Sequence, residues 1–345
     1  MKKKIIALTV TSLLATTAQA ANVYDAEGTT ADIYGRVQLD IEDPGADDVT
    51  GVGSARFGFK ASSEVAPGLK AITHGEWQLD AENSNTDDAI SARHVYLGVD
   101  HETTGRFLFG QTNTAFYQAV AATDIFHSYG YAAFGGIEDG RQEGQFVYDA
   151  TFAGVYVGAS YQFSNKDFEV SMGNPDVRGN IVDTGLKLDS AYALTLGYKF
   201  AFGLDVYAGY HDENLSGGNA DGTKSNMALS AGYSLGDLYL GAAVVQAEYN
   251  GDNLLDGIVH LVDDTKLLGY DLVASYNVLT NVSVYGGYAT KEAEFSYQSN
   301  MDQADEFTLG AAYKLNSNAK VWGEYKVDNI DGADNVWTIA AQYNF

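Results

Sequence analysis

The sequence is short of several residue types, and each shortage excludes a class of protein or site. It contains no cysteine, which excludes disulfide bonds and thiolate metal sites, and only three prolines among 345 residues. Beyond the first 20 residues, no apolar run approaches the roughly 18 residues that a transmembrane helix needs. Basic residues are also scarce: 20 Lys and Arg stand against 46 Asp and Glu, and a formal net charge of −26 argues against nucleic-acid binding.

The first 20 residues differ in kind from the rest of the chain. Three lysines follow Met1, an apolar stretch occupies residues 5–14, and the segment ends on Ala18-Gln19-Ala20. This pattern predicts a secretory signal peptide over residues 1–20, removed after Ala20. Its removal takes away three Lys and no acid, which brings the formal net charge to −29. Residues 21–345 show no linker-like shift in composition, so we expect a single domain there.

The chain ends on an alternating run, residues 339–345, with an apolar residue at every second position and Phe345 as the last. Four internal segments repeat this alternation, with Tyr as the last but one of their apolar residues: 194–200, 229–235, 272–278 and 309–315. A period of two predicts β-strands with one apolar face. Each internal copy is followed by a short turn and a second alternating strand. The repeating unit is therefore a hairpin, and the predicted fold is a closed sheet with tyrosines at one level.

Sixteen alternating segments can be counted along the chain. Their connections alternate between short turns, such as residues 65–68 and 153–154, and longer loops rich in Asp, Asn and Gly. These features predict an all-β fold, a 16-stranded antiparallel transmembrane β-barrel with periplasmic turns, extracellular loops and a water-filled lumen. The segments are centred on residues 32–41, 55–64, 69–79, 91–100, 106–111, 144–152, 155–163, 190–200, 204–212, 225–235, 238–249, 267–277, 282–291, 306–315, 319–327 and 335–345.

The two faces of the clearer strands can be assigned from the alternation. In residues 306–315, the face with Phe307, Leu309 and Tyr313 is expected to meet lipid, and the face with Glu306 and Thr308 to meet water. The segments 91–100 and 238–249 alternate poorly. A strand packed against a neighbouring subunit would lose the pattern in this way.

The order of several short motifs along the chain carries a resemblance to a known family. The motifs are Asn22-Val23-Tyr24-Asp25, Ala31-Asp32-Ile33-Tyr34-Gly35-Arg36, Ala55-Arg56-Phe57-Gly58-Phe59-Lys60, Ala122-Thr123-Asp124-Ile125, Phe134-Gly135-Gly136 and the terminal Tyr343-Asn344-Phe345. From end to end, the chain after the signal resembles a general diffusion porin of the Gram-negative outer membrane. The resemblance implies a homotrimer of sixteen-stranded barrels, each with its own pore. It also assigns Tyr343 and Phe345 to the C-terminal signal that the barrel-assembly machinery reads.

The third long loop, residues 112–143, is singled out by its length and its aromatic content. Loops this long without strands of their own are usually functional. It contains six aromatic residues, whose full exposure to water would be unfavourable, so we expect the loop to pack against another part of the protein. In similar porins this loop folds into the barrel and narrows the pore. The six aromatic residues are Phe116, Tyr117, Phe126, Tyr129, Tyr131 and Phe134.

The resemblance also assigns charged residues to the pore constriction. Arg36, Arg56 and Arg93 match a basic cluster on the barrel wall, and Asp124 matches an acidic position on the loop across the pore. Opposed charges across a narrow gap create a transverse field that selects among dipolar solutes. The chain departs from the family pattern at two positions, because Ala133 replaces a loop carboxylate and Asp149 replaces a wall arginine. The acids that can compensate on the loop side are Glu138, Asp139 and Glu143.

Other candidate chemistry is weaker. Gly232-Tyr233-Ser234-Leu235-Gly236 fits the pattern of a hydrolase nucleophile, but Ser234 precedes a hairpin turn and not a helix. The six histidines show no close ligand spacing, so no metal site and no cofactor are predicted. Acidic outer loops of this kind are usually just solvated; a second interpretation is that they bind Ca²⁺ or Mg²⁺ loosely and so bridge to lipopolysaccharide.

The leading interpretation is an outer-membrane channel for passive diffusion of small hydrophilic solutes and ions, with a mild cation preference and no enzymatic activity. An alternative is a channel that prefers one solute, whose mark would be an aromatic slide in the lumen; inward Tyr156, Tyr207 and Tyr285 are too dispersed to establish one. A further alternative is an outer-membrane hydrolase barrel. That class has fewer strands and needs a Ser/His or Asp/His pair, which the sequence does not reveal.

Overall fold

The architecture comes from a computed structural model of the chain. It describes residues 20–45, 48–80, 90–135, 137, 140–173, 181–217, 220–252, 265–295 and 299–345. The predicted signal peptide, apart from Ala20, lies outside the described residues, and so do Glu138 and Asp139. The signal peptide and the roles of these two acids therefore stay predictions.

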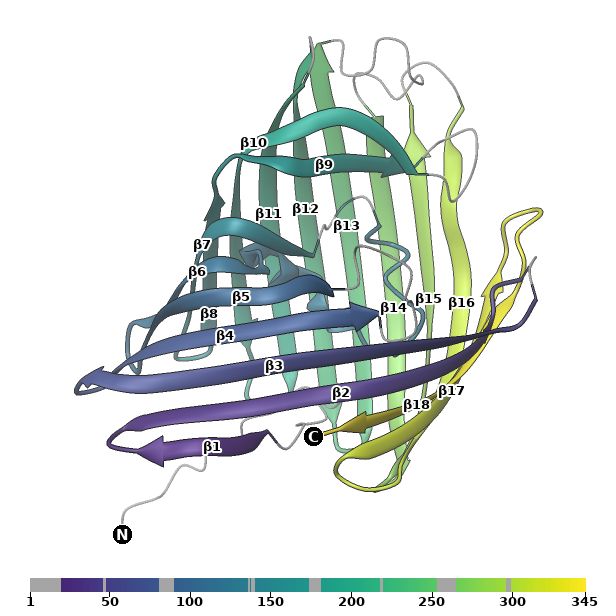
Figure 1. Cartoon of the computed structure of the whole chain (residues 1–345). Helices are drawn as coiled ribbons and strands as arrows, with labels where there is room; N and C mark the ends of the chain where they lie inside the picture. The colour runs from purple at the N-terminus through teal and green to yellow at the C-terminus, as the bar shows by residue number, and fades with distance from the viewer. Residues whose placement is uncertain are drawn as a thin grey trace.

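Sixteen strands of the described chain form a closed antiparallel barrel, which confirms the predicted fold class (Figure 1). Every segment predicted from the alternation corresponds to one strand of the barrel. These strands are β2 (Thr29–Asp43), β3 (Thr50–Ala66), β4 (Leu69–Asp80), β5 (Ile90–His101), β6 (Gly105–Asn113), β7 (Arg141–Phe152), β8 (Val155–Gln162), β10 (Ile181–Lys199), β11 (Leu204–Gly217), β12 (Ala220–Leu235), β13 (Leu238–Asp252), β14 (Thr265–Leu279), β15 (Val282–Glu294), β16 (Met301–Lys314), β17 (Ala319–Asp328) and β18 (Val336–Asn344).

The first and last strands of the barrel pair and so close it, and a second pairing bypasses the short strand β9 (Asn165–Gly173). β18 pairs with β2, from Trp337 opposite Asp43 to Asn344 opposite Arg36. β8 pairs directly with β10. The strand between them in sequence, the short β9, forms a hairpin with β10 and lies beside its outer part. A further short strand, β1 (Ala21–Ala26), pairs with the first residues of β2. β1 and β9 were not predicted from the sequence.

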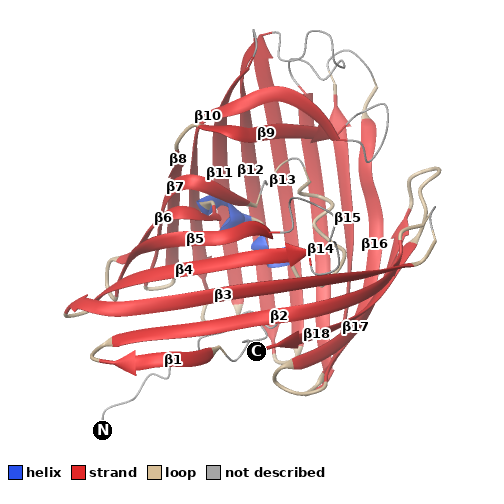
Figure 2. Cartoon of the chain, viewed as in Figure 1, coloured by secondary structure: helices blue, strands red, loops and turns tan. Residues whose placement is uncertain are grey.

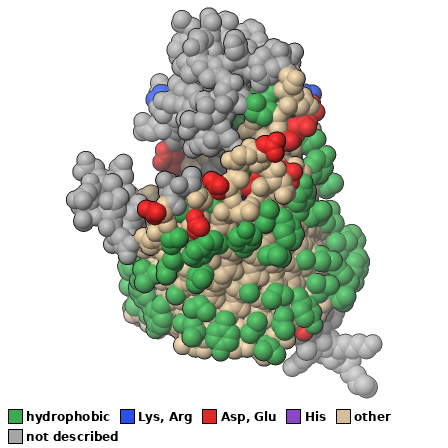
Figure 3. Space-filling view, turned by 90° about the vertical axis from the view of Figure 1, so that its right-hand side faces the viewer, with side chains coloured by type: hydrophobic (Ala, Val, Ile, Leu, Met, Phe, Trp, Pro, Cys, Tyr) green, Lys and Arg blue, Asp and Glu red, His purple; other side chains and the backbone are tan. Residues whose placement is uncertain are grey.

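The alternation of side chains separates a lipid-facing from a lumen-facing surface. On β16, Leu309 is 53% exposed and Phe307 is 40% exposed, whereas Thr308 between them is 3% exposed. Hydrophobic side chains form a band on the outside of the wall, with acidic side chains beyond one edge of the band (Figure 3). The alternation predicted for residues 306–315 is therefore present, with the apolar side chains on the outer face. The inner face differs from the prediction, because Glu306 and Thr308 are buried and not in contact with water. Among the described residues, no helix has the length and apolar character needed to cross a bilayer.

The poor alternation of β5 has a local cause. Glu76 of β4 pairs with His94 of β5, and the next residue, Trp77, pairs with Ala92, so that Arg93 is an extra residue in a β-bulge. A bulge shifts the side-chain parity by one and can point two successive side chains to the same face. The bulge accordingly brings both Arg93, which binds Glu76, and His94 to the inner face.

Candidate pore constriction

The loop between β6 and β7 lies inside the barrel, against the inner face of the wall (Figure 2). Two short 3₁₀ helices, η1 (Ala115–Ala119) and η2 (Ala121–Thr123), contact β8 and the strands from β10 to β14. Phe116, Val120 and Phe134 are completely buried. The packing expected from the aromatic content of the loop is therefore present, and its partner is the lumen wall.

Inward-facing glycines make room for this loop. A Cβ atom added at Gly209 of β11 would lie 2.6 Å from the Cβ of Ala119, and one added at Gly241 of β13 would overlap the carbonyl oxygen of Ala122. On β14, a Cβ at Gly269 would overlap the carbonyl oxygen of Ala133 in the same way. We call Gly209, Gly241 and Gly269 the glycine seat. Its missing side chains let the backbone of the loop approach the wall.

Hydrogen bonds fix the loop along its length. The Thr195 hydroxyl donates to the carbonyl oxygen of Ala115 over 2.8 Å, and the Tyr239 hydroxyl donates to that of Ala122 over 2.6 Å. Farther along, the carboxylate of Glu324 accepts three consecutive backbone N–H groups, those of residues 127–129, at 2.7 to 3.0 Å. The Tyr285 hydroxyl also donates to Glu324, over 2.9 Å. Charge-assisted hydrogen bonds of this kind are stronger than neutral ones, so Glu324 is the firmest anchor of the loop.

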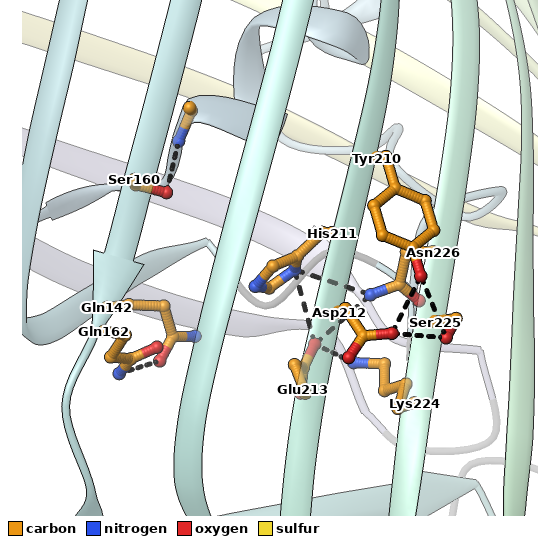
Figure 4. Close-up of polar contacts among 11 residues, drawn as sticks. Gln142, Ser160, Gln162, Tyr210, His211, Asp212, Glu213, Lys224, Ser225 and Asn226 are labelled. Atoms are coloured by element: carbon orange, nitrogen blue, oxygen red, sulfur yellow. Dashed lines mark hydrogen bonds and ion pairs between the residues drawn. The ribbon is translucent and has the colours of Figure 1, made fainter.

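A buried polar layer lies on β11 and β12 next to the loop (Figure 4). Lys224 Nζ lies 3.2 Å from Glu213 Oε1, and these side chains are 1% and 2% exposed. The amide of Asn226 donates to the same carboxylate oxygen over 3.2 Å, and His211 Nδ1 lies 3.4 Å from it. The His211 ring also packs on the Phe116 ring, with centroids 5.9 Å apart. Removing one member of such a buried pair strongly destabilises a protein, so this layer is part of the support of the loop.

The loop also explains the weak alternation of β13. Its inward residues Gly241, Ala243, Val245 and Ala247 are all buried, and Val245 and Ala247 belong to one apolar cluster with Phe116 and Phe134 of the loop. β13 is therefore apolar on both faces, because the loop covers the inner one. A neighbouring subunit is not needed to account for the pattern.

The inward aromatic residues support the loop as well. Tyr207 is 4% exposed and belongs to the same cluster as Phe116, and Tyr156 packs edge-on against Tyr207 with centroids 5.6 Å apart. Tyr285 is 3% exposed and packs against Phe126 of the loop at 5.8 Å. Rings buried to this extent offer no continuous stacking surface to a passing solute.

The three arginines assigned to the constriction lie near one another on the opposite part of the wall. Arg36 of β2 and Arg56 of β3 are register partners, and each interacts electrostatically with Arg93 of β5. Arg93 Nε lies 2.7 Å from a carboxylate oxygen of Glu76, and Arg56 Nε donates to Gln78 over 2.7 Å.

The sequence analysis missed Arg141 as a member of this group. It is the first residue of β7 and also interacts electrostatically with Arg56. The Gly140-Arg141 pair at the end of the loop is the only signal in the sequence that could have marked it. We call Arg36, Arg56, Arg93 and Arg141 the arginine wall.

The acidic residues predicted for the constriction occupy different positions. Asp124 is exposed at the end of η2, and its carboxylate accepts a hydrogen bond from the Tyr117 hydroxyl over 2.9 Å. Asp149 of β7 is ion-paired with Arg106 of β6 at 2.8 Å, near the short turn that ends β7, so an arginine on the neighbouring strand balances its charge. No carboxylate at Glu138 or Asp139 is described.

The remaining predicted features take ordinary structural positions. The backbone N–H and carbonyl of Phe345 exchange hydrogen bonds with Gly35, at 3.0 and 2.8 Å, and Tyr343 is exposed on the lipid face. Ser234 lies at the end of β12, where its backbone N–H donates to the carbonyl of Gly203. Within the described part of the chain, no group of three or more His, Asp or Glu side chains is arranged to hold a metal ion.

Comparison with known proteins agrees with this architecture. Outer membrane protein YedS of Escherichia coli is 25% identical, over 99% of this chain and 96% of its own length. The major outer membrane protein of Pasteurella multocida is 27% identical, and the match covers both chains completely. Among solved structures, Salmonella typhi OmpF in complex with daunomycin superposes with a TM-score of 0.77 at 19% identity, over 94% of this chain and all of that one. The family model described as Gram-negative porin matches residues 7–345, so the chain belongs to the Gram-negative porin family and is a β-barrel channel of the outer membrane.

Proposed function

We propose that the protein is a passive channel for small hydrophilic solutes and ions, without enzymatic activity. The observation that carries the proposal is the loop seated inside a closed barrel, opposite a wall that keeps its arginines uncovered. A solute that passes between them meets Asp124 on one side and the arginine wall on the other. Fixed charges across a narrow opening act on dipoles and ions without any input of energy.

We further propose a mild preference for cations. The net charge of −29 after removal of the signal peptide favours cations near the mouth of the channel. The arginine wall opposes this attraction, but one of its members, Arg93, is ion-paired with Glu76. Arg106, which lies outside the wall, is ion-paired with Asp149. Exposed charges act over about one Debye length, roughly 8 Å in physiological salt, so the charges near the opening have the largest effect on the sign of the selectivity.

The reversal potential across a planar bilayer in a KCl gradient tests both proposals. We expect discrete conductance steps and a potential of the sign given by a higher permeability for K⁺ than for Cl⁻. Liposome swelling with sugars of increasing size measures the exclusion limit. A protein that gives no conductance would refute the channel, and an anion-selective wild type would refute the cation preference alone.

The predicted partners belong to the same proposal. The Vibrio cholerae OmpT structure described as a trimer form superposes with a TM-score of 0.74 at 21% identity, over 92% of this chain and all of that one. We propose that this chain is a homotrimer as well, that lipopolysaccharide contacts it through divalent cations, and that Tyr343 and Phe345 are read by the barrel-assembly machinery. Unboiled samples should migrate as an SDS-resistant oligomer that boiling converts to a monomer. Migration as a monomer before boiling would contradict the trimer.

A further inference from the structure

Two lysines at the short-turn end of the lumen extend the arginine wall. Lys314 is the last residue of β16, and its register partner on β17 is Lys320. The pairing continues from Lys320 to Gln342 of β18 and from Gln342 to Gln38 of β2, two positions from Arg36 and on the same face. Lys314, Lys320 and Arg36 therefore share one level of the inner wall, and we call them the basic trio.

The trio carries three positive charges. The acids that interact electrostatically with Arg36 are Glu76, which is ion-paired with Arg93, and Asp40, whose carboxylate accepts hydrogen bonds from the Gln38 amide. Lys320 is 7% exposed and interacts electrostatically with both Arg36 and Lys314. In the described part of the chain, no carboxylate lies within ion-pair distance of any of the three. Glu324 also interacts with Lys320, but its oxygens accept the loop N–H groups and the Tyr285 hydroxyl.

The immediate neighbours of Lys320 add no negative charge. Its Nζ lies 3.3 Å from Nδ1 of His127 on the loop and 4.8 Å from the centroid of the Trp322 ring. Burial, together with the charge of Lys320, lowers the pKa of His127 to about 3, so this imidazole is neutral at physiological pH and accepts a hydrogen bond from the ammonium. Lys320 thus has a neutral ring on either side and no carboxylate within ion-pair distance among the described residues.

Arg36 supplies an independent sign of a missing acceptor. Its Nε is buried and has no hydrogen-bond partner. A buried charged donor is strongly unfavourable unless it is paired. A guanidinium binds a tetrahedral oxyanion through its planar fork, and an ammonium adds a point charge to the same ligand. Lys314 is exposed, so the site is open to the lumen.

We propose that the basic trio binds an oxyanion, namely phosphate as the free ion or as the phosphate group of a small solute. This inference rests on the proposed channel function and names a ligand class for it. A bound phosphate would neutralise this part of the basic wall and reduce the permeability of Cl⁻ relative to K⁺. Phosphate would therefore make the pore more cation-selective in a saturable manner, and a plain water-filled channel does not predict the saturation.

The test measures the reversal potential in a KCl gradient while potassium phosphate replaces part of the salt at constant ionic strength and pH. We expect phosphate to shift the wild-type potential toward cations in a saturable manner. In Lys320→Gln, half-saturation should require about tenfold more phosphate, the change expected when one charge-assisted hydrogen bond is lost. Inorganic sulfate serves as a second tetrahedral oxyanion probe and should act in the same way.

Matched variants keep the test decisive. Lys266→Gln removes a cation from the outer face of β14, where Lys266 pairs with Glu248 at 3.1 Å, and it should respond to phosphate like the wild type. Lys314→Gln removes an exposed member of the trio and replaces Lys320→Gln if that variant does not form a barrel. An unsaturable or unchanged potential in the wild type, or equal saturation in the trio variants, would overturn the site. Since conductance is recorded in every trace, loss of the site is distinguished from failure of the channel.

Discussion

The two sides of the lumen are built differently. The side from β10 to β17 is covered by the loop, and its inner face has the features of a protein interior, with glycines, buried aromatic rings and a Lys–Glu pair that is 1% and 2% exposed. In the described part of the chain, η1 and η2 do not pack on the side from β2 to β5. The inner face of that side carries partly exposed arginines whose partners are single side chains such as Glu76 and Gln78.

This difference separates two properties of the pore. The position of the loop depends on packing and buried hydrogen bonds, which tolerate little change in volume or polarity. The charge of the open side depends on partly exposed side chains, which can change with less effect on the fold than fully buried ones. Pore size should therefore respond to substitutions on the covered side, and ion selectivity to substitutions on the open side.

The largest effect on the pore is expected when the loop that covers one side of the lumen is deleted. Deletion of residues 119–136 should raise the single-channel conductance several-fold and let larger sugars enter in liposome swelling, because the loop no longer occupies the lumen. Strand pairing closes the barrel independently of the loop, so circular dichroism should still report β-structure. An unchanged exclusion limit would show that the loop does not limit the pore.

A smaller change in pore size is expected from filling the glycine seat. In Gly241→Val, the new side chain overlaps the carbonyl oxygen of Ala122, so the loop must move toward the pore axis and the conductance should fall. Overpacking of this kind also destabilises proteins by about 1–3 kcal/mol, which thermal unfolding of the oligomer can measure. The matched control is Gly323→Val on β17, where an added Cβ meets nothing closer than 3.6 Å. Equal conductance in the two variants would contradict the role of the seat.

The open side should govern selectivity without a change in size. Arg56→Gln removes one charge from the arginine wall, so the reversal potential in a KCl gradient should shift toward cations while the sugar exclusion limit stays the same. Lys266→Gln on the outer face should leave the potential unchanged, because it lies outside the lumen. A shift of equal size in both variants would mean that overall charge, and not the wall, sets the selectivity.

The smallest effect is expected from Asp149→Arg. The substitution replaces an ion pair with two guanidinium groups, so the potential should shift toward anions. The shift should be smaller than that of Arg56→Gln, because the Arg106–Asp149 pair lies near the short turn and apart from the other arginines. A larger shift than in Arg56→Gln would place Asp149 at the narrowest point of the pore.

The sequence predicted the barrel well because alternation is a local signal. All sixteen strands, including the last one, which ends one residue before Phe345, follow from a period of two. The alternation is weak in β5 and β13 for reasons that are not local. In β5, the bulge at Arg93 depends on pairing with β4. In β13, the apolar inner face depends on a loop more than a hundred residues earlier in the chain.

The candidate site was predicted only in part, because much of it depends on contacts between segments that are distant in the sequence. A resemblance in motif order predicted the approximate location of Arg36, Arg56 and Arg93. Contacts between distant segments create the rest: the glycine seat, the three hydrogen bonds from backbone N–H groups to Glu324, and the Arg106–Asp149 pair. A glycine in a strand can mark a bulge, a bend or a close approach, and the sequence does not say which. Arg141 was missed because it follows the loop and belongs to no strand pattern that singles it out.

The pairing of β18 with β2 has a consequence for the order in which the protein can be made. The indole N–H of Trp337 donates to Asp43 over 3.0 Å, across a separation of 294 residues. A nascent chain that stops before β18 leaves β17 and β2 with unpaired edges, a state that a bilayer does not tolerate. The barrel therefore cannot be completed during synthesis, and the unclosed chain must be protected during its passage to the membrane.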